Sequence, residues 1–385
     1  MFEFSVPTKV IYGDGFINKV GDITKDYGER IFLVTDAKTM QETGYITKVK
    51  KLLEDQSYGV LLFNKIYSSS KNDSNSNIVN RGADQARHAK CDVIVGFGGK
   101  TTLNIAKAIS FLVSNGGNLE DYFLGRKGNE KKVTYIEIPT AYGFMPGLSN
   151  SFYILDKFDS VKKGIETSNN YADVVLVDPK LTTTIPGKLS AYIGIENLSL
   201  AIESFISKKN NPFAEALSIK AIELVYNNLA KSLQDPENIS FKGLLCTSGI
   251  LTSLAVANSS PGLCYAISLA MNSVFGVYQG LVSSILLPQV MEFNITSSAN
   301  KYVYVAKALG KNVLDITVVE AAIKAIEEVR KIISDLRIPT KLSELNIDKE
   351  ELMQVAKLVR QYEFIQYLPR PVTKDDIYSI LVAAY

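Results

Sequence analysis

The sequence predicts an α/β domain with a parallel, Rossmann-like sheet, followed by an all-α domain. Short runs rich in β-branched residues alternate with segments of helical spacing in the first half of the chain. After Val177-Asp178-Pro179 the strand signal disappears, and long helical segments continue to the C-terminus. We therefore expect an α/β domain over residues 1–179 and a helical domain over residues 180–385.

The strands of the first domain are predicted from short and nearly continuous apolar runs. Such runs are typical of strands covered on both faces, as in a parallel sheet. Helical spacing at Ile46–Leu53 and Ile78–His88 indicates helices on both faces of this sheet. The polar tract SSSKNDSNSN, residues 68–77, is expected to form an exposed loop over the sheet edge. The five apolar runs are Ile31–Val34, Val60–Phe63, Val93–Val95, Tyr135–Ile138 and Val174–Val177.

The second domain contains a long stretch without any charged side chain, residues 243–291. Asn258, Pro261 and Asn272 interrupt it, and no window of about 20 residues is continuously apolar, which a membrane helix needs. We therefore expect core helices of a soluble domain here and no membrane span. The other helices of this domain are predicted at Pro212–Ala230, Asp315–Leu336 and Lys349–Tyr362.

The overall composition favours a small-molecule ligand or a protein partner. Lysine plus arginine (42) nearly balances aspartate plus glutamate (40), so the chain lacks the net charge that attracts nucleic acid or anionic lipid. Cys91, Cys246 and Cys264 are too few and too far apart for a disulfide framework, so we expect buried, reduced thiols. The N-terminus lacks the pattern of a signal peptide, which favours a cytoplasmic location.

A glycine-rich turn is the first candidate for ligand binding. In CDVIVGFGGKTTLNIAKAIS a strand leads through Gly98 and Gly99 into a helix that is expected to begin near Thr101. Glycines let the backbone approach a ligand, and the helix N-terminus attracts a phosphate. Lys100 can add a positive charge, and Thr101 or Thr102 can cap the helix. A tight turn with an N-cap and no ligand accounts for the same pattern.

Asp36 is the second candidate, because it ends the predicted strand IFLVT. A carboxylate at the tip of such a strand can accept hydrogen bonds from both ribose hydroxyls of NAD, and it repels the 2′-phosphate of NADP. An aspartate that only stabilises a turn remains the alternative.

Several further segments show a likeness to one family. They are VPTKVIYGDG, VTDAKTMQETG, the PT that opens PTAYGFMPGLSNSFYI, VVLVDPKLTTTIPGKLSAYIGIENLSLAIESFIS, QGLVSSILLPQVMEFN and PRPVTKDDIYSIL. With the glycine-rich segment, they resemble the iron-containing alcohol dehydrogenase superfamily, which includes glycerol dehydrogenase and maleylacetate reductase. The likeness runs nearly the full length of the chain. It implies hydride transfer between a nicotinamide cofactor and an alcohol or carbonyl, with a divalent metal polarising the substrate oxygen.

The metal ligands that the resemblance implies are missing from this sequence. The family's aspartate falls on Glu196, and its three histidine ligands fall on Leu200, Tyr265 and Gln279. A further active-site histidine falls on Leu269. The chain has one histidine, His88, which is expected on a helix surface in the first domain. A three-histidine site is therefore impossible, and we predict no tightly bound iron or zinc.

The cofactor positions that the resemblance implies are better retained. Lys100 stands where a third glycine is usual, and Asn104 replaces an aspartate. The family's AGTGSE segment is AYGFMPGLS here, so Phe144, Met145 and Pro146 are expected to crowd the nicotinamide. The positions that align with family residues around ribose, pyrophosphate and nicotinamide are Asp36, Gly98, Gly99, Thr101, Thr140 and Lys162.

Three functions remain open from the sequence. The first is a metal-independent, NAD-dependent oxidoreductase in which Tyr265, with Glu196, handles the substrate proton. The second is a catalytically inactive homologue that acts as a nucleotide-binding or structural subunit, paired with an active relative in a hetero-oligomer. The third is a nucleotide-binding protein whose former metal pocket accepts an apolar ligand at Leu200 and Leu269. The apolar surface of the helical half also favours a homodimer.

Overall fold

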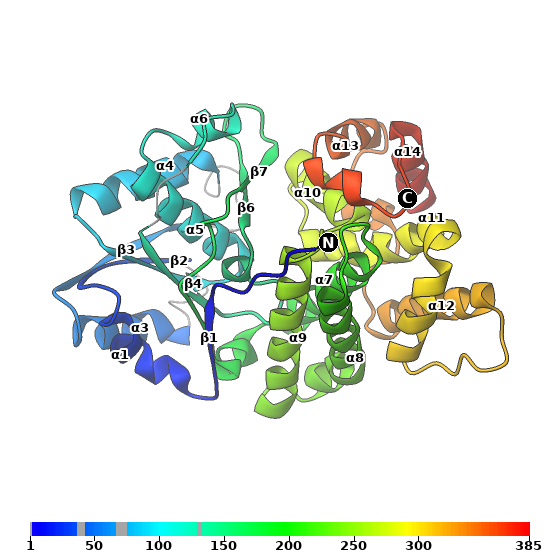
Figure 1. Ribbon diagram of the computed structural model, residues 1–385, viewed down its shortest axis with the longest axis horizontal. Coiled ribbons are helices and arrows are strands. Elements are labelled where there is room, and N and C mark those ends of the chain that lie inside the picture. The colour runs from blue at the N-terminus through cyan, green and yellow to red at the C-terminus, as the bar shows by residue number, and fades with distance from the viewer. Residues whose placement is uncertain (1, 37–42, 67–74, 129–132) are drawn as a thin grey trace. The chain divides into compact units, whose positions relative to one another are not determined.

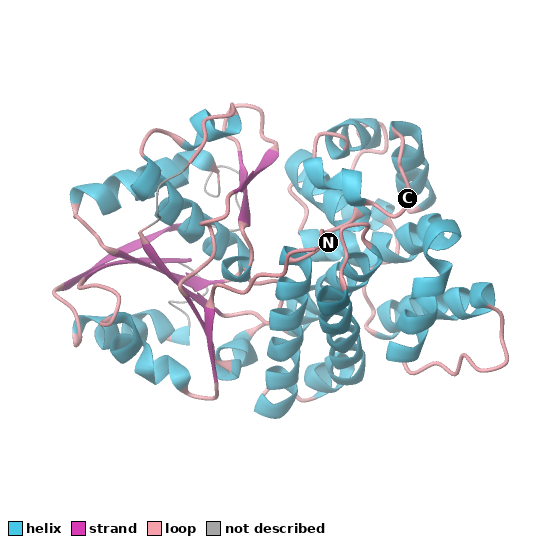
Figure 2. Ribbon diagram, in the orientation of Figure 1, coloured by secondary structure: helices cyan, strands magenta, loops and turns pink. Residues whose placement is uncertain are grey.

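The computed structural model describes residues 2–36, 43–66, 75–128 and 133–385, and the chain forms two compact units. The sheet unit spans Val6–Thr184. The helical unit comprises Ile185–Tyr385 together with the N-terminal residues up to Ser5. Figure 2 shows that the strands belong to the sheet unit and that the helical unit contains helices and loops. The predicted fold class is therefore confirmed.

The sheet unit is built on six parallel strands in the order β1-β8-β5-β4-β2-β3. The five apolar runs lie in five of these strands. Strands β2, β4, β5 and β8 are buried along nearly their whole length, which suits a continuous apolar sequence, and the edge strand β3 is partly exposed. The prediction missed β1, which is short and only partly buried, and the antiparallel hairpin of β6 and β7. The strands are β1 Lys9–Tyr12, β2 Arg30–Asp36, β3 Gly59–Ile66, β4 Val93–Gly98, β5 Thr134–Pro139, β6 Ser151–Leu155, β7 Lys162–Glu166 and β8 Val174–Val177.

Helices cover both faces of this sheet, with α1 and α3 on one side and α4 and α5 on the other (Figure 1). Ile31 and Leu33 point toward α1 and α3, and the intervening Phe32 points to the opposite face, where its ring lies 5.5 Å from that of Phe63. This alternation is the two-residue period of a strand. The helices are α1 Val20–Thr24, α3 Tyr45–Glu54, α4 Ser76–His88, α5 Lys100–Asn115 and α6 Leu119–Phe123, with short 3-10 turns at Phe16–Lys19, Pro146–Leu148 and Pro179–Thr184.

The sequence predicts an exposed loop over residues 68–77, and the structure tests only the end of this tract. Residues 68–74 lie outside the described part of the chain. Asn75 caps α4 by accepting a hydrogen bond from Asn77 N, and Ser76 is fully buried. The end of the tract is therefore a helix N-terminus, because asparagine side chains satisfy the free amides of a first turn. His88 ends the same helix and is exposed, as expected.

The helical unit is organised around α7, which is buried along most of its length. It packs against α8, α9, α10 and α11. The charge-free stretch forms α9, α10 and the start of α11. Cys246 and Cys264 of this unit, like Cys91 of the sheet unit, are buried free thiols. The helices are α7 Gly187–Ile206, α8 Pro212–Gln234, α9 Ile239–Ala257, α10 Leu263–Phe275, α11 Gln279–Ala308, α12 Val318–Asp335, α13 Leu352–Val359 and α14 Lys374–Ala383, with 3-10 turns at Leu342–Leu345 and Glu363–Tyr367.

One helix of the described residues, α9, is long and apolar enough to cross a membrane by those two criteria. In its most apolar stretch 56% of the residues are buried inside the protein, where the helix packs against α7 and α8. A core helix passes the same two criteria, because the interior of a protein is also apolar.

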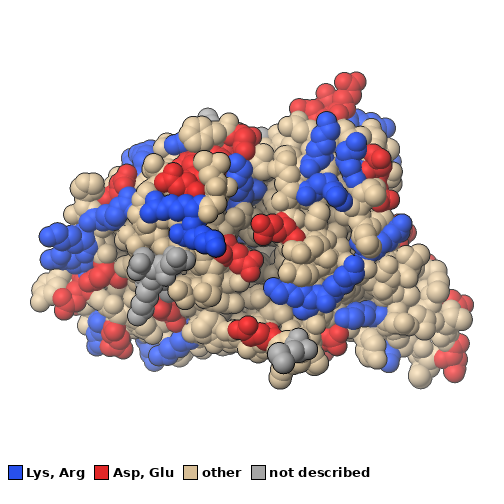
Figure 3. Space-filling model, turned by 45° about the horizontal axis from the view of Figure 1, so that its top comes forward, with Lys and Arg blue, Asp and Glu red and all other residues tan. Residues whose placement is uncertain are grey.

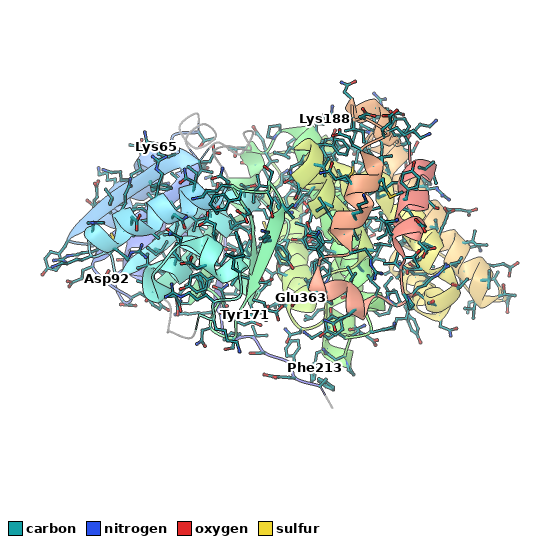
Figure 4. All side chains as sticks on the ribbon, turned by 90° about the horizontal axis from the view of Figure 1, so that it is seen from above. Lys65, Asp92, Tyr171, Lys188, Phe213 and Glu363 are labelled. Atoms are coloured by element: carbon teal, nitrogen blue, oxygen red, sulfur yellow. The ribbon has the colours of Figure 1, made fainter. Side chains whose placement is uncertain are left out.

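The boundary between the units lies after Thr184, and not at Pro179 as the sequence predicts. The turn Pro179–Thr184 stays with the sheet unit because Leu181 is buried in the core between the sheet and α3. The first residues of the chain belong to the other unit. Ser5 exchanges two backbone hydrogen bonds with the Asn258 side chain, at 2.7 and 3.0 Å. The ring of Phe4 lies 5.1 Å from that of Phe213, which is labelled in Figure 4.

Charged side chains of both signs are interspersed over the face of the protein shown in Figure 3. No large area of that face carries a single sign of charge. The expectation that the protein binds a small molecule or another protein, and neither nucleic acid nor anionic lipid, stays a prediction from its composition and charge distribution.

Candidate functional site

The carboxyl ends of three neighbouring strands meet at one edge of the sheet unit. Asp36 is the last residue of β2, Gly98 is the last residue of β4, and Thr140 follows β5. The Thr140 amide donates a hydrogen bond to the Gly98 carbonyl at 3.0 Å. Since β3 lies on one side of the β2–β4 pair and β5 on the other, the winding of the chain reverses between β2 and β4. Open parallel sheets bind their ligands at such a switch point.

The glycine-rich turn after β4 has the geometry of a phosphate site. A Cβ at Gly98 would lie 2.9 Å from Thr102 Cβ, so the backbone is too close to α5 for any side chain. A Cβ at Gly99 would meet no atom within 4 Å, so this residue faces open space. Gly99 is also the N-cap of the 16-residue helix α5 and has no side chain to satisfy the first amides. These amides and the helix dipole are therefore directed at an open position.

The expected caps of this helix are wrong. The helix begins at Lys100, one residue earlier than predicted, and neither Thr101 nor Thr102 caps it. Both threonines lie inside the first turn, where Thr102 is buried under Gly98. Asn104 instead donates to the Lys100 carbonyl at 2.8 Å and accepts from the Tyr153 amide at 3.0 Å. It thereby ties the first turn of α5 to strand β6.

A buried lysine holds the loop that follows β5. Lys107 is 1% exposed, and its ammonium donates hydrogen bonds to the carbonyls of Pro146 (2.7 Å), Ser149 (2.7 Å) and Ser151 (2.8 Å). The three hydrogen bonds of the ammonium group thus join α5 to this loop and to the first residue of β6. The buried ammonium group of Lys107 therefore holds the loop against α5.

Glu137 supports the same loop from β5. Its carboxyl group accepts hydrogen bonds from the Tyr135 hydroxyl at 2.9 Å and from the Gly147 amide at 2.8 Å. Burial raises the pKa of Glu137 to about 7, against the opposing effects of these hydrogen bonds and of the positive charge on Lys107. A Cβ at Gly147 would lie 2.9 Å from this carboxyl group, so only glycine fits there.

Phe144, Met145 and Pro146 differ in their exposure. Met145 and Pro146 are buried, and only Phe144 is partly exposed. The expectation that these three residues crowd the nicotinamide stays a prediction. Lys162, the remaining predicted cofactor residue, opens β7 on the separate hairpin and is half-buried.

The positions of the family's metal ligands lie on three helices of the helical unit that meet one another. Glu196 and Leu200 lie one turn apart on α7, Tyr265 lies on α10, and Gln279 is the first residue of α11. The Cys264 thiol donates to the Ser283 carbonyl of α11 at 3.7 Å, and a Cβ at Gly280 would lie 2.8 Å from the Tyr192 carbonyl of α7. All four positions are buried, with 2–7% of each residue exposed.

A second buried carboxyl group, Glu203 of α7, fixes the N-terminus of α10. Its two oxygens accept hydrogen bonds from the amides of Cys264 (2.5 Å) and Tyr265 (3.2 Å). A Cβ at Gly262, the N-cap of α10, would lie 2.6 Å from this carboxyl group, so the residue must be glycine. Burial raises the pKa of Glu203 to about 7, although the amide hydrogen bonds favour its charged form. The backbone of Tyr265 is thus held directly by α7.

One aromatic side chain packs against Tyr265. The Tyr265 ring lies 6.0 Å from that of Phe364, which in turn stacks on Tyr362 at 5.6 Å. Phe364 and Tyr362 come from the chain around the 3-10 turn Glu363–Tyr367, and Leu269 follows Tyr265 by one turn of α10. The pocket positions therefore combine apolar surface with the polar groups of Glu196, Tyr265 and Gln279.

Comparison with known proteins identifies the family. The model described as iron-containing alcohol dehydrogenase matches residues 7–179, and the model of the C-terminal part of the Fe-containing alcohol dehydrogenase family matches residues 190–385. The chain belongs to the iron-containing alcohol dehydrogenase family.

Similar proteins cover this family member over its full length. The NAD-dependent methanol dehydrogenase of Bacillus methanolicus is 27% identical, with 99% of each chain covered. The 1,3-propanediol dehydrogenase of Klebsiella pneumoniae is 24% identical, with 100% of this chain and 99% of its own covered. A crystal structure of a 1,3-propanediol oxidoreductase superposes with a TM-score of 0.94 at 24% identity, with 100% of each chain covered. This last likeness confirms the fold.

The residues of this family member do not fit the metal that the family name implies. Leu200 has no donor atom, Tyr265 and Gln279 offer neutral oxygen and nitrogen groups, and Glu196 is the one carboxylate of the set. Iron and zinc sites need several histidine, thiolate or carboxylate ligands. Among the described residues, no three or more His, Cys, Asp and Glu side chains are grouped so that they could hold a metal ion. The absence of tightly bound iron or zinc stays a prediction.

Sequence reasoning missed Lys107 and Glu203, two of the buried charged residues that shape these sites. Each had a weak signal. Lys107 is the one charged residue within LNIAKAISFLV, and Glu203 lies seven positions after Glu196, on the same face of a helix. Their partners lie 39–44 and 61–62 residues away along the chain, so only the folded structure identifies them.

Proposed function

We propose that this chain is an NAD-dependent oxidoreductase that transfers hydride between the nicotinamide and an alcohol or carbonyl compound without a tightly bound transition metal. The observation that carries the proposal is the uncapped start of α5 at Gly99, which faces open space beside Asp36 at the switch point of the sheet. Relatives that match over nearly the whole chain are named as dehydrogenases and a reductase. They favour an enzyme over an inactive subunit.

The cofactor assignment follows from the chemistry of each position. Asp36 accepts hydrogen bonds from the two ribose hydroxyls. The Gly98-Gly99 turn binds the pyrophosphate together with Lys100 and Thr101. Thr140 and Lys162 are assigned to the nicotinamide end of the cofactor. In the helical unit, Tyr265 donates the proton that a carbonyl oxygen needs after hydride addition, and Glu196 assists its exchange. Homodimer formation and a cytoplasmic location remain predictions from the sequence.

Calorimetric titration of metal-stripped protein with NADH and NADPH tests this proposal. We expect NADH to bind with a Kd of about micromolar order, and at least about tenfold more tightly than NADPH, because Asp36 repels a 2′-phosphate. Added zinc or ferrous iron should not change either affinity. If neither dinucleotide binds, the proposed function is wrong.

Gly99→Ser tests the phosphate site. Serine is a favoured N-cap, so it should preserve the thermal stability of the sheet unit while its hydroxyl competes for the amides at the start of α5. We expect the NADH affinity to fall about tenfold or more, since the loss of phosphate hydrogen bonds is worth at least about 1.4 kcal/mol. Gly59→Ser is the matched control, because Gly59 also faces open space but lies at the amino end of β3. Unchanged affinity in Gly99→Ser would place the phosphate elsewhere.

Tyr265→Phe tests the proton donor. We expect kcat for aldehyde reduction to fall by about 10²-fold or more, as for the loss of a general acid, with NADH affinity unchanged. Tyr304→Phe, on the exposed face of α11, is the control and should retain full activity. If Tyr265→Phe turns over at the wild-type rate, Tyr265 only packs against Phe364.

A further inference from the structure

The side-chain amide of Gln279 is a buried hydrogen-bond donor that lacks an acceptor. Gln279 is 4% exposed, and among the described residues none accepts a hydrogen bond from its Nε2. Buried amide groups nearly always have partners, because removing a donor from water without replacing its hydrogen bond is unfavourable. This donor is therefore available to an acceptor atom of a bound ligand.

The backbone around Gln279 adds donors of the same kind. Gln279 opens the 30-residue helix α11, and the side chain of its N-cap residue, Tyr278, does not cap the first amides of the helix. The first amides of a helix have no acceptor within the helix, and the dipole gives this end a partial positive charge. Gly280 presses this first turn against the Tyr192 carbonyl of α7, one turn before Glu196. The turn that carries Gln279 is thus held in place by close packing.

The surroundings restrict the ligand. The residues named at this site include no lysine or arginine, and Glu196 adds a carboxylate, so the site suits the oxygen of an uncharged carbonyl group better than a carboxylate or phosphate. The helices that meet here carry Leu200 and Leu269, and Phe364 packs on Tyr265. Such apolar and aromatic walls favour an apolar or aromatic substituent.

We propose that the Gln279 carboxamide and the N-terminus of α11 bind the carbonyl oxygen of an uncharged aromatic or apolar aldehyde, at the position where the family holds its metal ion. This assignment rests on the proposed function. Hydride, with its two electrons, leaves C4 of NADH and bonds to the carbonyl carbon, and NADH becomes NAD⁺. The C=O π bond breaks, its electron pair stays on oxygen, and the Tyr265 hydroxyl supplies the proton. The Gln279 carboxamide donates a hydrogen bond to the carbonyl oxygen while negative charge develops on that oxygen.

The test uses 4-(dimethylamino)benzaldehyde, whose absorption shifts to longer wavelength when its carbonyl oxygen is polarised. We expect this red shift with the wild-type protein in EDTA, without any turnover, and its loss in Gln279→Leu. Gln289→Leu is the matched control, since it is the same substitution ten residues later on the same helix, and it should keep the shift. We also expect kcat to fall about 10²- to 10³-fold in Gln279→Leu, as for the loss of an oxyanion donor.

Gln279→Glu protects the test against misfolding of the leucine variant. At pH 8 its carboxylate accepts hydrogen bonds instead of donating them, so the shift should again disappear while the side chain keeps its size. The proposal is overturned if the red shift survives both substitutions, if it requires added zinc or ferrous iron, or if the wild-type protein does not bind the probe. Calorimetry with NADH separates the two proposals: a wild-type protein that shifts the probe but does not bind NADH keeps this site and loses the proposed function.

Discussion

Lys107→Met will lower the free energy of unfolding of the sheet unit by about 3–5 kcal/mol, as expected when one member of a buried charged network is removed. Three carbonyl groups that now accept from the ammonium, those of Pro146, Ser149 and Ser151, would lose this donor. Glu137 would lose the one positive charge that lowers its pKa. We expect the loop after β5 to loosen and NADH affinity to fall with it.

Differential scanning calorimetry of the purified variant measures this effect, and Lys65→Met is its control. Lys65 is an exposed lysine of β3 (Figure 4), so its replacement removes the same charge without affecting a buried network. Surface substitutions of this kind change stability by about 0.5 kcal/mol or less. If Lys107→Met melts at the temperature of the control, the three carbonyl contacts contribute little, and our account of the loop is wrong.

Glu203→Gln will change how stability depends on pH. The folded pKa of Glu203 is raised from 4.5 to about 7, so the folded protein retains a proton that the unfolded chain has lost in this range. The stabilisation is therefore fully present below pH 4.5, and it is lost as the pH rises through 7, by up to about 3 kcal/mol. Glutamine does not titrate. The melting temperature of Glu203→Gln relative to wild type should thus rise between pH 5 and pH 8.

Glu137, which also titrates near pH 7, is present in both proteins and cancels in this comparison. Glu203→Ala is the companion variant, since it removes both acceptors and leaves the amides of Cys264 and Tyr265 buried without partners. Each buried amide without a partner lowers the free energy of unfolding by about 1–3 kcal/mol, so Glu203→Ala should be less stable than wild type at every pH. A melting difference between wild type and Glu203→Gln that stays constant from pH 5 to pH 8 would show that Glu203 does not titrate in this range.

The elements that sequence reasoning predicted correctly are those with a strong local pattern. Strands β2, β4, β5 and β8 contain nearly continuous apolar runs, and α8 and α12 have a clear helical spacing. The missed strands, β1 and the β6–β7 hairpin, are short and partly exposed, so their residues carry little of this signal. A local sequence pattern identifies helices and strands whose apolar residues recur with the period of that structure. The pattern is weak for strands whose formation depends on pairing with strands distant in the sequence.

The sequence by itself determined that this protein cannot build a three-histidine metal site, because it contains one histidine, and it placed Asp36 and Gly98-Gly99 at strand ends. Only the tertiary structure decided what these features mean together. It brought the ends of β2, β4 and β5 to one edge, gave the buried Lys107 its three carbonyl partners, and left the amide of Gln279 buried without an acceptor in the described part of the chain. The physical reason is that burial and hydrogen-bond satisfaction depend on partners about 40 to 60 residues away along the chain, which no local pattern encodes.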